Sequence, residues 1–147
     1  MAQEAEITPV VDAEPLALME RWEEDRLQIF DGAEATLAEI EWVTRPLVVF
    51  ANSPNDPRFI QQMDLLADRP EELALRDVIV LVDTDPSTLS ELRERFRPRG
   101  FMLALLAKDG TIVFRKPSPW DVREISRSID KMPLRQQEMR DRRELSQ

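Results

Sequence analysis

Two uninterrupted apolar runs, at residues 46–51 and 78–82, constrain the fold of this 147-residue chain more than any other feature. Both are rich in β-branched residues, and their hydrophobicity is continuous rather than alternating. Strands of this kind are covered on both faces, as in the centre of an α/β sheet. A helical pattern at 57–67 separates the runs, and such a strand–helix–strand unit requires a right-handed crossover between parallel strands. We therefore expect an α/β fold built around a parallel strand pair.

Periodicity and turn residues predict the other elements. We expect helices from Pro15 onward, at 33–41, at 71–75, at 87–96 and from Trp120 or Asp121 up to Pro133, and strands at 27–30, 101–107 and 112–114. The last two strands are joined by a Lys-Asp-Gly hairpin turn. Asp56 and Asp85 each precede a proline, and an aspartate cap followed by a first-position proline predicts a helix start. We place Phe59, Ile60, Met63 and Leu66 on the buried side of the 57–67 helix, and Leu89, Leu92 and Phe96 on that of the 87–96 helix.

The net charge of −9 is distributed unevenly along the chain. Residues 1–41 hold twelve acidic and two basic side chains, whereas the remainder carries a net charge of +1. We expect residues 1–14 to form a disordered acidic arm, which either keeps the protein soluble or docks a partner. Nucleic acid is not an expected partner, because the excess positive charge is confined to a short C-terminal tail and no basic face is evident.

Cysteine and histidine are both absent from the chain. Thiol chemistry is therefore excluded, and so is the commonest general base. No run of about 18 apolar residues predicts a membrane span. The first residues, Met1-Ala2-Gln3-Glu4, lack the basic and apolar regions of a signal peptide. They resemble the start of a mature exported protein to which an initiator methionine has been added.

A parallel unit, a crossover helix, a hairpin opened by Lys108-Asp109-Gly110 and a C-terminal helix together resemble the thioredoxin superfamily. The lead-in at 27–32 is peroxiredoxin-like in particular. More narrowly, the chain resembles a family of unknown function that occurs as bacterial, often exported, single domains and in animal sushi-repeat-containing extracellular proteins. That resemblance rests on Trp42, Arg76-Asp77-Val78, Lys108-Asp109-Gly110 and the block at 129–138, which is its most specific part.

The resemblance implies a thioredoxin-like, three-layer α/β/α fold with a mixed central sheet and a β-α-β-α-β-β-α core. It divides the chain into the arm at 1–14, a peroxiredoxin-like N-terminal extension at 15–41, the thioredoxin-like domain at 42–133 and a charged tail at 134–147. We expect this tail to be a frayed helical extension. The resemblance also implies a periplasmic or exported protein.

In thioredoxin relatives the redox cysteines lie where the first strand meets its helix, which here falls near Ser53 and Asp56. The position usually held by a cis-proline falls near Met102. Three familiar elements of thiol exchange are thus missing together. The resemblance therefore does not imply redox activity for this chain.

The carboxyl ends of parallel strands share one edge of the sheet, where ligands usually bind. We expect a ligand or partner edge there that is formed by Ser53, Asn55, Asp56, Arg97, Arg99 and Met102. Arg97 and Arg99 flank a proline, and with the N–H groups at the start of the 57–67 helix they would hold an anion or a partner carboxylate. The alternative interpretation is a solvated loop.

We expect no catalytic residue, cofactor or metal. Ser53 has no evident base to activate it, and Asp83 with Asp85 supplies only two carboxylates for a cation. The first functional interpretation is a non-catalytic binding or scaffold module whose partner is an envelope protein or a small anion. Two alternatives stay open: a cysteine-independent enzyme at the Ser53–Asp56 edge, and a protein that modulates a redox partner without turnover. A homodimer is compatible with the opposite charges of the N-terminal helix and the tail.

Overall fold

The computed structural model describes residues 17–145 of the chain. The predicted arm at 1–14 and the predicted helix start at Pro15 lie outside this range. The strands are β1 (Ile29–Asp31), β2 (Arg45–Phe50), β3 (Val78–Asp83), β4 (Met102–Leu106) and β5 (Ile112–Lys116). The helices are α2 (Leu18–Glu24), the 3-10 turn η2 (Gly32–Glu34), α3 (Leu37–Ile40), α4 (Pro57–Asp68), α5 (Pro70–Leu75), α6 (Glu91–Phe96), α7 (Val122–Asp130) and α8 (Pro133–Leu145).

All five strands form one mixed sheet in the order β1-β3-β2-β4-β5. β3 lies parallel to both β1 and β2, with Val80 opposite both Ile29 and Leu47. β4 runs antiparallel to β2, and β5 runs antiparallel to β4. The predicted parallel pair and the late antiparallel hairpin are both confirmed.

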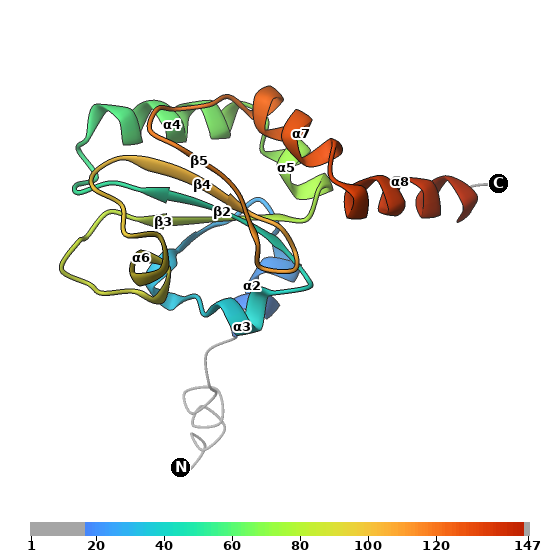
Figure 1. The fold of residues 1–147 in the computed structure, drawn as a ribbon, viewed down its shortest axis with the longest axis horizontal. Helices are drawn as coiled ribbons and strands as arrows, with labels where there is room; N and C mark the ends of the chain where they lie inside the picture. The colour runs from blue at the N-terminus through green and yellow to red at the C-terminus, as the bar shows by residue number, and fades with distance from the viewer. Residues whose placement is uncertain (1–16, 146–147) are drawn as a thin grey trace, which may run out of the picture.

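Helices cover both faces of the sheet, with α4, α5 and α7 on one side and α2, α3 and α6 on the other (Figure 1). Every residue of β2 is buried. Its alternate side chains enter two separate cores, Val48 and Phe50 with Trp22, and Leu47 and Val49 with Ile125. This double burial explains the continuous apolar sequence of β2. It also confirms the three-layer α/β arrangement.

The start of α4 is where the sequence places it. The Asp56 carboxylate accepts a hydrogen bond from the backbone N–H of Arg58 at 2.8 Å, and Pro57 is the first helical residue. Ile60 of this helix was expected to be buried and is 49% exposed. Gln62 is buried instead, because its amide binds the backbone N–H and carbonyl of Trp120 at 3.0 and 2.7 Å.

The predicted helix start at Asp85 is wrong. The Asp85 carboxylate accepts hydrogen bonds from the backbone N–H of Ser87 and from the hydroxyls of Ser87 and Thr88, which closes a turn instead of starting a helix. α6 begins only at Glu91, where the Ser90 hydroxyl accepts from the Arg93 N–H at 3.1 Å. Leu89, which was expected to face inward, is therefore 73% exposed.

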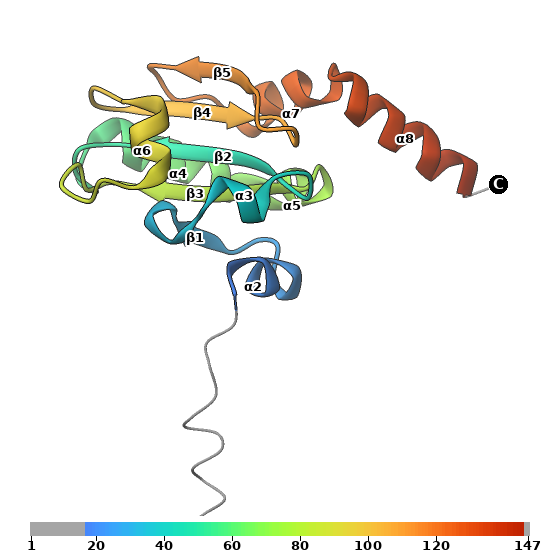
Figure 2. The ribbon, with the colours of Figure 1, turned by 60° about the horizontal axis from the view of Figure 1, so that its bottom comes forward.

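Two further segments differ from the prediction at their ends. The helix expected at 33–41 is divided into η2 and α3, with extended residues between them. At the other end, α7 stops at Asp130 and Pro133 begins the thirteen-residue helix α8, so the tail is helical up to Leu145, as predicted. α8 projects away from the sheet and its helices (Figures 1 and 2).

Candidate functional site

A buried ion pair occupies the carboxyl ends of β2 and β3, at the predicted ligand edge. Arg93 of α6 donates from Nε and Nη2 to the Asp83 carboxylate at 3.1 and 2.9 Å, and Nη2 also donates to the carbonyl of Ala51 at 3.0 Å. Ser90 donates to the other Asp83 oxygen at 2.6 Å. Asp83 and Arg93 are both buried. Asp83 is thus fully partnered, and Arg93 closes the space between the ends of β2 and β3.

The loop between β2 and α4 uses its polar groups locally. The Ser53 hydroxyl accepts a hydrogen bond from the Asn55 N–H at 3.0 Å, and Asp56 caps α4. Asn55 itself is exposed. No side chain in this loop has the paired nucleophile and base that covalent catalysis requires.

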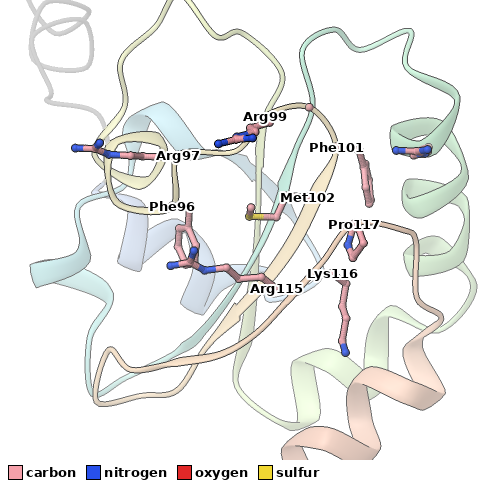
Figure 3. Close-up of a pocket in the computed structure, with 10 residues that line it drawn as sticks. Phe96, Arg97, Arg99, Phe101, Met102, Arg115, Lys116 and Pro117 are labelled. Atoms are coloured by element: carbon pink, nitrogen blue, oxygen red, sulfur yellow. The ribbon is translucent and has the colours of Figure 1, made fainter.

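A cavity of about 490 Å³ lies beside the closed part, at the same edge of the sheet. The strand register places it there, because Met102 pairs with Phe50 at the end of β2, and Lys116 pairs with Leu103. Its walls come from the start of α4, the α6–β4 loop, the start of β4 and the end of β5 (Figure 3). We call it the basic cavity; its lining residues are Arg58, Phe96, Arg97, Arg99, Gly100, Phe101, Met102, Arg115, Lys116 and Pro117.

Five of these ten lining residues are cationic and none is acidic. Within residues 17–145, none of the five forms an ion pair with a carboxylate; they are Arg58, Arg97, Arg99, Arg115 and Lys116. A concave site that concentrates one sign of charge attracts the opposite charge. The arrangement is therefore suited to an anion.

The cations of the cavity are not equivalent. The Arg115 guanidinium lies over the ring of Phe96 at 5.4 Å, and the Lys116 ammonium lies over the ring of Trp120 at 4.4 Å. Arg99 and Arg115 flank Met102, whereas Arg97 and Lys116 extend away from it (Figure 3). Stacking on Phe96 restricts the Arg115 side chain while leaving the edge of its guanidinium for a ligand.

Three of the six predicted edge residues line this cavity, namely Arg97, Arg99 and Met102. Ser53, Asn55 and Asp56 do not, although Asp56 fixes the helix start that carries Arg58. Three of the cationic lining residues were missed, namely Arg58, Arg115 and Lys116. Arg115 directly follows the strand predicted at 112–114, and the pairing of β5 with β4 brings it to this edge. Arg93, which closes the neighbouring space, was missed because only the packing of α6 against the ends of β2 and β3 places it there.

The opposite end of the sheet holds a second group of charges, which we call the α8 anchor: Arg45, Asp77, Lys108 and Glu138. Lys108 donates to the carboxylates of Asp77 and Glu138 at 2.8 and 2.9 Å. Arg45 is fully buried and donates to both Glu138 oxygens at 3.2 and 3.1 Å. These bonds join the start of β2, the turn before β3 and the β4–β5 hairpin to α8.

A neighbouring pair strengthens the junction between α7 and α8. Arg76 donates to both oxygens of Asp130 at 3.0 and 2.9 Å, and the buried Arg135 donates to Asp130 at 3.3 Å. The hydrogen bond from Arg76 is the main reason why the pKa of Asp130 lies below its ordinary value. Burial alone would raise the pKa of Glu138, but hydrogen bonds from Lys108 and Arg45 outweigh it, so this pKa is also lowered.

A family described as "Domain of unknown function (DUF4174)" matches residues 36–138 of the chain. The chain belongs to this family. Five motif residues of the family resemblance, which are scattered in the sequence, meet in the α8 anchor and the Arg76–Asp130 pair: Arg76, Asp77, Lys108, Asp130 and Glu138. In this DUF4174 domain the most specific block, at 129–138, therefore has a structural role: it fastens α8 to the sheet. No curated protein matches the sequence.

Among solved structures, reduced 2-Cys peroxiredoxin from Plasmodium vivax is similar, with a TM-score of 0.55 and 12% identity, covering 69% of this chain and 86% of that one. Prx1a from Plasmodium yoelii, modified at its N-terminus, has a TM-score of 0.52 and 14% identity, covering 69% and 82%. Thioredoxin peroxidase I from Plasmodium yoelii gives 0.51 and 12%, with the same coverage. These likenesses show a thioredoxin-like fold. The chain itself has no cysteine.

Neither a metal centre nor a membrane helix is evident in the described part of the chain. Residues 17–145 contain no group of three or more potential metal ligands. In the same range, no helix has the length and apolar character needed to cross a bilayer.

Proposed function

We propose that this domain is a non-catalytic binding module that holds an anionic ligand in the basic cavity. The observation that carries the proposal is that five cationic residues and no acidic one line a single hollow, with Arg99 and Arg115 on either side of Met102. A volume of about 490 Å³ lies in the range of small-molecule sites. Because five cations line this hollow, the expected ligand carries more than one anionic group.

The chemistry of arginine supports this proposal. A guanidinium presents paired N–H donors that match a carboxylate or a phosphate, and such charge-assisted bonds are about twice as strong as neutral ones. Arg99 and Arg115 approach the cavity from different elements, the α6–β4 loop and β5. Two anionic groups on one small ligand would satisfy both cations.

The test is a titration with citrate and with pyrophosphate at low ionic strength, followed by calorimetry and by the backbone NMR shifts of residues 97–102 and 115–116. The double variant Arg99→Gln/Arg115→Gln should weaken binding by about tenfold or more, since about 1.4 kcal/mol of lost interaction corresponds to one factor of ten. Added salt should weaken binding to the wild type as well.

A variant with the same change in charge is the control. Arg123→Gln/Arg127→Gln removes two exposed cations from α7, neither of which lines the basic cavity. Its affinity for both anions should stay within about twofold of the wild type. Equal losses in the two variants, or no binding by the wild type at millimolar anion, would overturn the proposal.

The enzymatic alternative at the Ser53–Asp56 edge has less support, because these side chains are engaged in turn and cap hydrogen bonds. Modulation of a redox partner without turnover is compatible with an anion site, since that partner's acidic surface would be the ligand. The periplasmic location and the processed N-terminus stay predictions. Cell fractionation followed by mass determination of the N-terminus tests both.

A further inference from the structure

The basic cavity has a second property besides its charge, which is a mixed surface. Met102 and Pro117 supply apolar surface between the arginines. A strand edge also lies next to it, because among residues 17–145 β5 is the last strand of the sheet and pairs only with β4. Such a surface fits an extended acidic peptide that carries apolar residues between its charges.

The chain itself contains a segment of this composition. Residues 1–16 hold Glu4, Glu6, Asp12 and Glu14 and no basic residue. Between these acids lie Val10 and Val11, which are β-branched and favour extended structure. The net charge of −4 of the segment is thus opposite in sign to the cavity.

We propose that the acidic N-terminal segment of this chain binds in its own basic cavity and competes there with an external anion. The proposal rests on the anion-binding function inferred above for that cavity. If the segment occupies the cavity, the full chain binds an external anion more weakly than it would with the cavity free. An anion would then have to displace the segment before it binds.

The position of α2 makes this contact reachable. Leu18 and Trp22 of α2 share one hydrophobic core with Leu92 and Phe96 of α6, and Phe96 also lines the cavity. The segment therefore joins the domain on the face that carries one cavity wall. Extended backbone from Ala17 spans up to about 25 Å at Val10 and up to about 45 Å at Glu4, whereas a domain of this size has a diameter of roughly 36 Å.

A spin label gives a direct test, which the absence of native cysteine makes simple. Val10→Cys in the full chain, carrying a nitroxide, should broaden the backbone NMR signals of Gly100, Met102 and Arg115. High salt should remove the broadening, because it screens the charges. The matched control is Leu145→Cys, a label at the exposed end of the projecting helix α8, which should leave those three signals sharp.

The same label distinguishes other occupants. Broadening around α8 instead of the cavity would overturn the proposal. A mixture of labelled protein without ¹⁵N and unlabelled protein with ¹⁵N should show no broadening. Broadening in that mixture would assign the contact to two copies and contradict binding within one chain.

Competition is tested with pyrophosphate on full-length variants. Glu4→Gln/Glu6→Gln/Asp12→Asn/Glu14→Gln should bind pyrophosphate up to about tenfold more tightly than the wild type, as expected if the segment fills the cavity about nine-tenths of the time. The control Glu24→Gln/Asp64→Asn/Glu71→Gln/Glu144→Gln makes the same change in net charge at four exposed positions. An equal gain in both variants would show a general charge effect and overturn the competition.

The two proposals fail in different ways. If neither variant nor the wild type binds pyrophosphate, the anion-binding function is wrong. If all bind it equally and the Val10 label broadens no cavity signal, the function stands and the competing segment is wrong.

Discussion

Two tryptophans in this chain have opposite environments although their local sequences look alike. Trp22 and Trp42 each follow acidic or amphipathic helical sequence. Trp22 is fully buried in the core below the sheet, with Arg26 stacked on its ring at 4.1 Å. Trp42 is 66% exposed and has a φ of 70°, a left-handed conformation that is rare for a bulky residue. The backbone N–H of Trp42 donates to the backbone carbonyl of Lys108 at 2.6 Å, and this bond connects the turn to the β4–β5 hairpin.

Replacement of the two residues should therefore have unequal effects on stability. Trp22→Ala is expected to lower the free energy of unfolding by about 3–5 kcal/mol through the cavity it leaves. Trp42→Ala should change the free energy of unfolding by less than about 0.5 kcal/mol, because only an exposed ring is removed. The left-handed backbone conformation at position 42 is as unfavourable for alanine as for tryptophan. Urea unfolding followed by far-UV circular dichroism measures both.

Trp22→Phe provides a second variant if the alanine protein does not fold. It should be destabilised by less than Trp22→Ala but by more than Trp42→Ala. Similar losses at positions 22 and 42 would contradict the burial described for Trp22.

At the scale of elements, the start of α6 shows how two capping signals compete. Asp85-Pro86 and Ser90 both satisfy the local rules for a helix start. Asp85 does not start the helix, because its carboxylate accepts hydrogen bonds from the hydroxyls of Ser87 and Thr88. Ser90 prevails because its hydroxyl both caps the helix and donates to the buried Asp83 at 2.6 Å. Tertiary contact thus selects between caps that are locally equivalent.

Ser90→Ala should lower the free energy of unfolding by about 1–2 kcal/mol, as expected for a lost cap that also leaves a buried carboxylate with one partner fewer. Asp85→Asn keeps most of its turn and should remain close to the wild type. Chemical denaturation compares the two variants. If Asp85→Asn lowered the free energy of unfolding by more than Ser90→Ala does, Asp85 rather than Ser90 would be the helix cap.

The attachment of α8 should depend on pH. The pKa values of Asp130 and Glu138 are both lowered in the folded protein. A carboxyl group whose folded pKa is depressed contributes stability that is fully present above its unfolded pKa, which is about 3.9 for Asp and 4.3 for Glu. That stability is lost as the pH falls through the folded pKa. The junction should therefore weaken in acid, below about pH 4.

Glu138→Gln tests this attachment, because it keeps the size of the side chain and removes its charge. Near pH 7 it should cost about 1–2 kcal/mol, since Arg45 and Lys108 lose their shared partner. The difference from the wild type should shrink as the pH falls through the lowered pKa of Glu138 in the folded protein, because the wild-type carboxylate then becomes protonated as well. A difference that is independent of pH would contradict the proposed role of the charge. The control Glu144→Gln, on the exposed end of α8, should be neutral.

At the scale of the whole molecule, one sheet separates two cores, and α8 projects from both. β2 and β3 lie in the middle of the sheet and are among the most buried strands. Residues 140–145 of α8 are all exposed. Stability should therefore fall steeply from the sheet to the end of α8.

Hydrogen exchange measured residue by residue should show this gradient. Backbone amides in the middle of β2 and β3 should exchange only through global unfolding, whereas those at 141–145 should exchange fastest among the helices. Protection of α8 equal to that of β2 would contradict a projecting helix. It would point instead to a partner that covers the helix in solution.

The sequence alone determined the order of elements, the parallel strand pair and the cap at Asp56, because burial on both faces and capping are local patterns. The exclusion of thiol chemistry also needed only composition. The tertiary structure decided which charges meet. Arg115 reaches the basic cavity through strand register, Arg93 closes the adjacent edge through the packing of α6, and the scattered motif residues join at α8. Spacing in the sequence carries no information on such contacts, since they depend on how distant segments pack together.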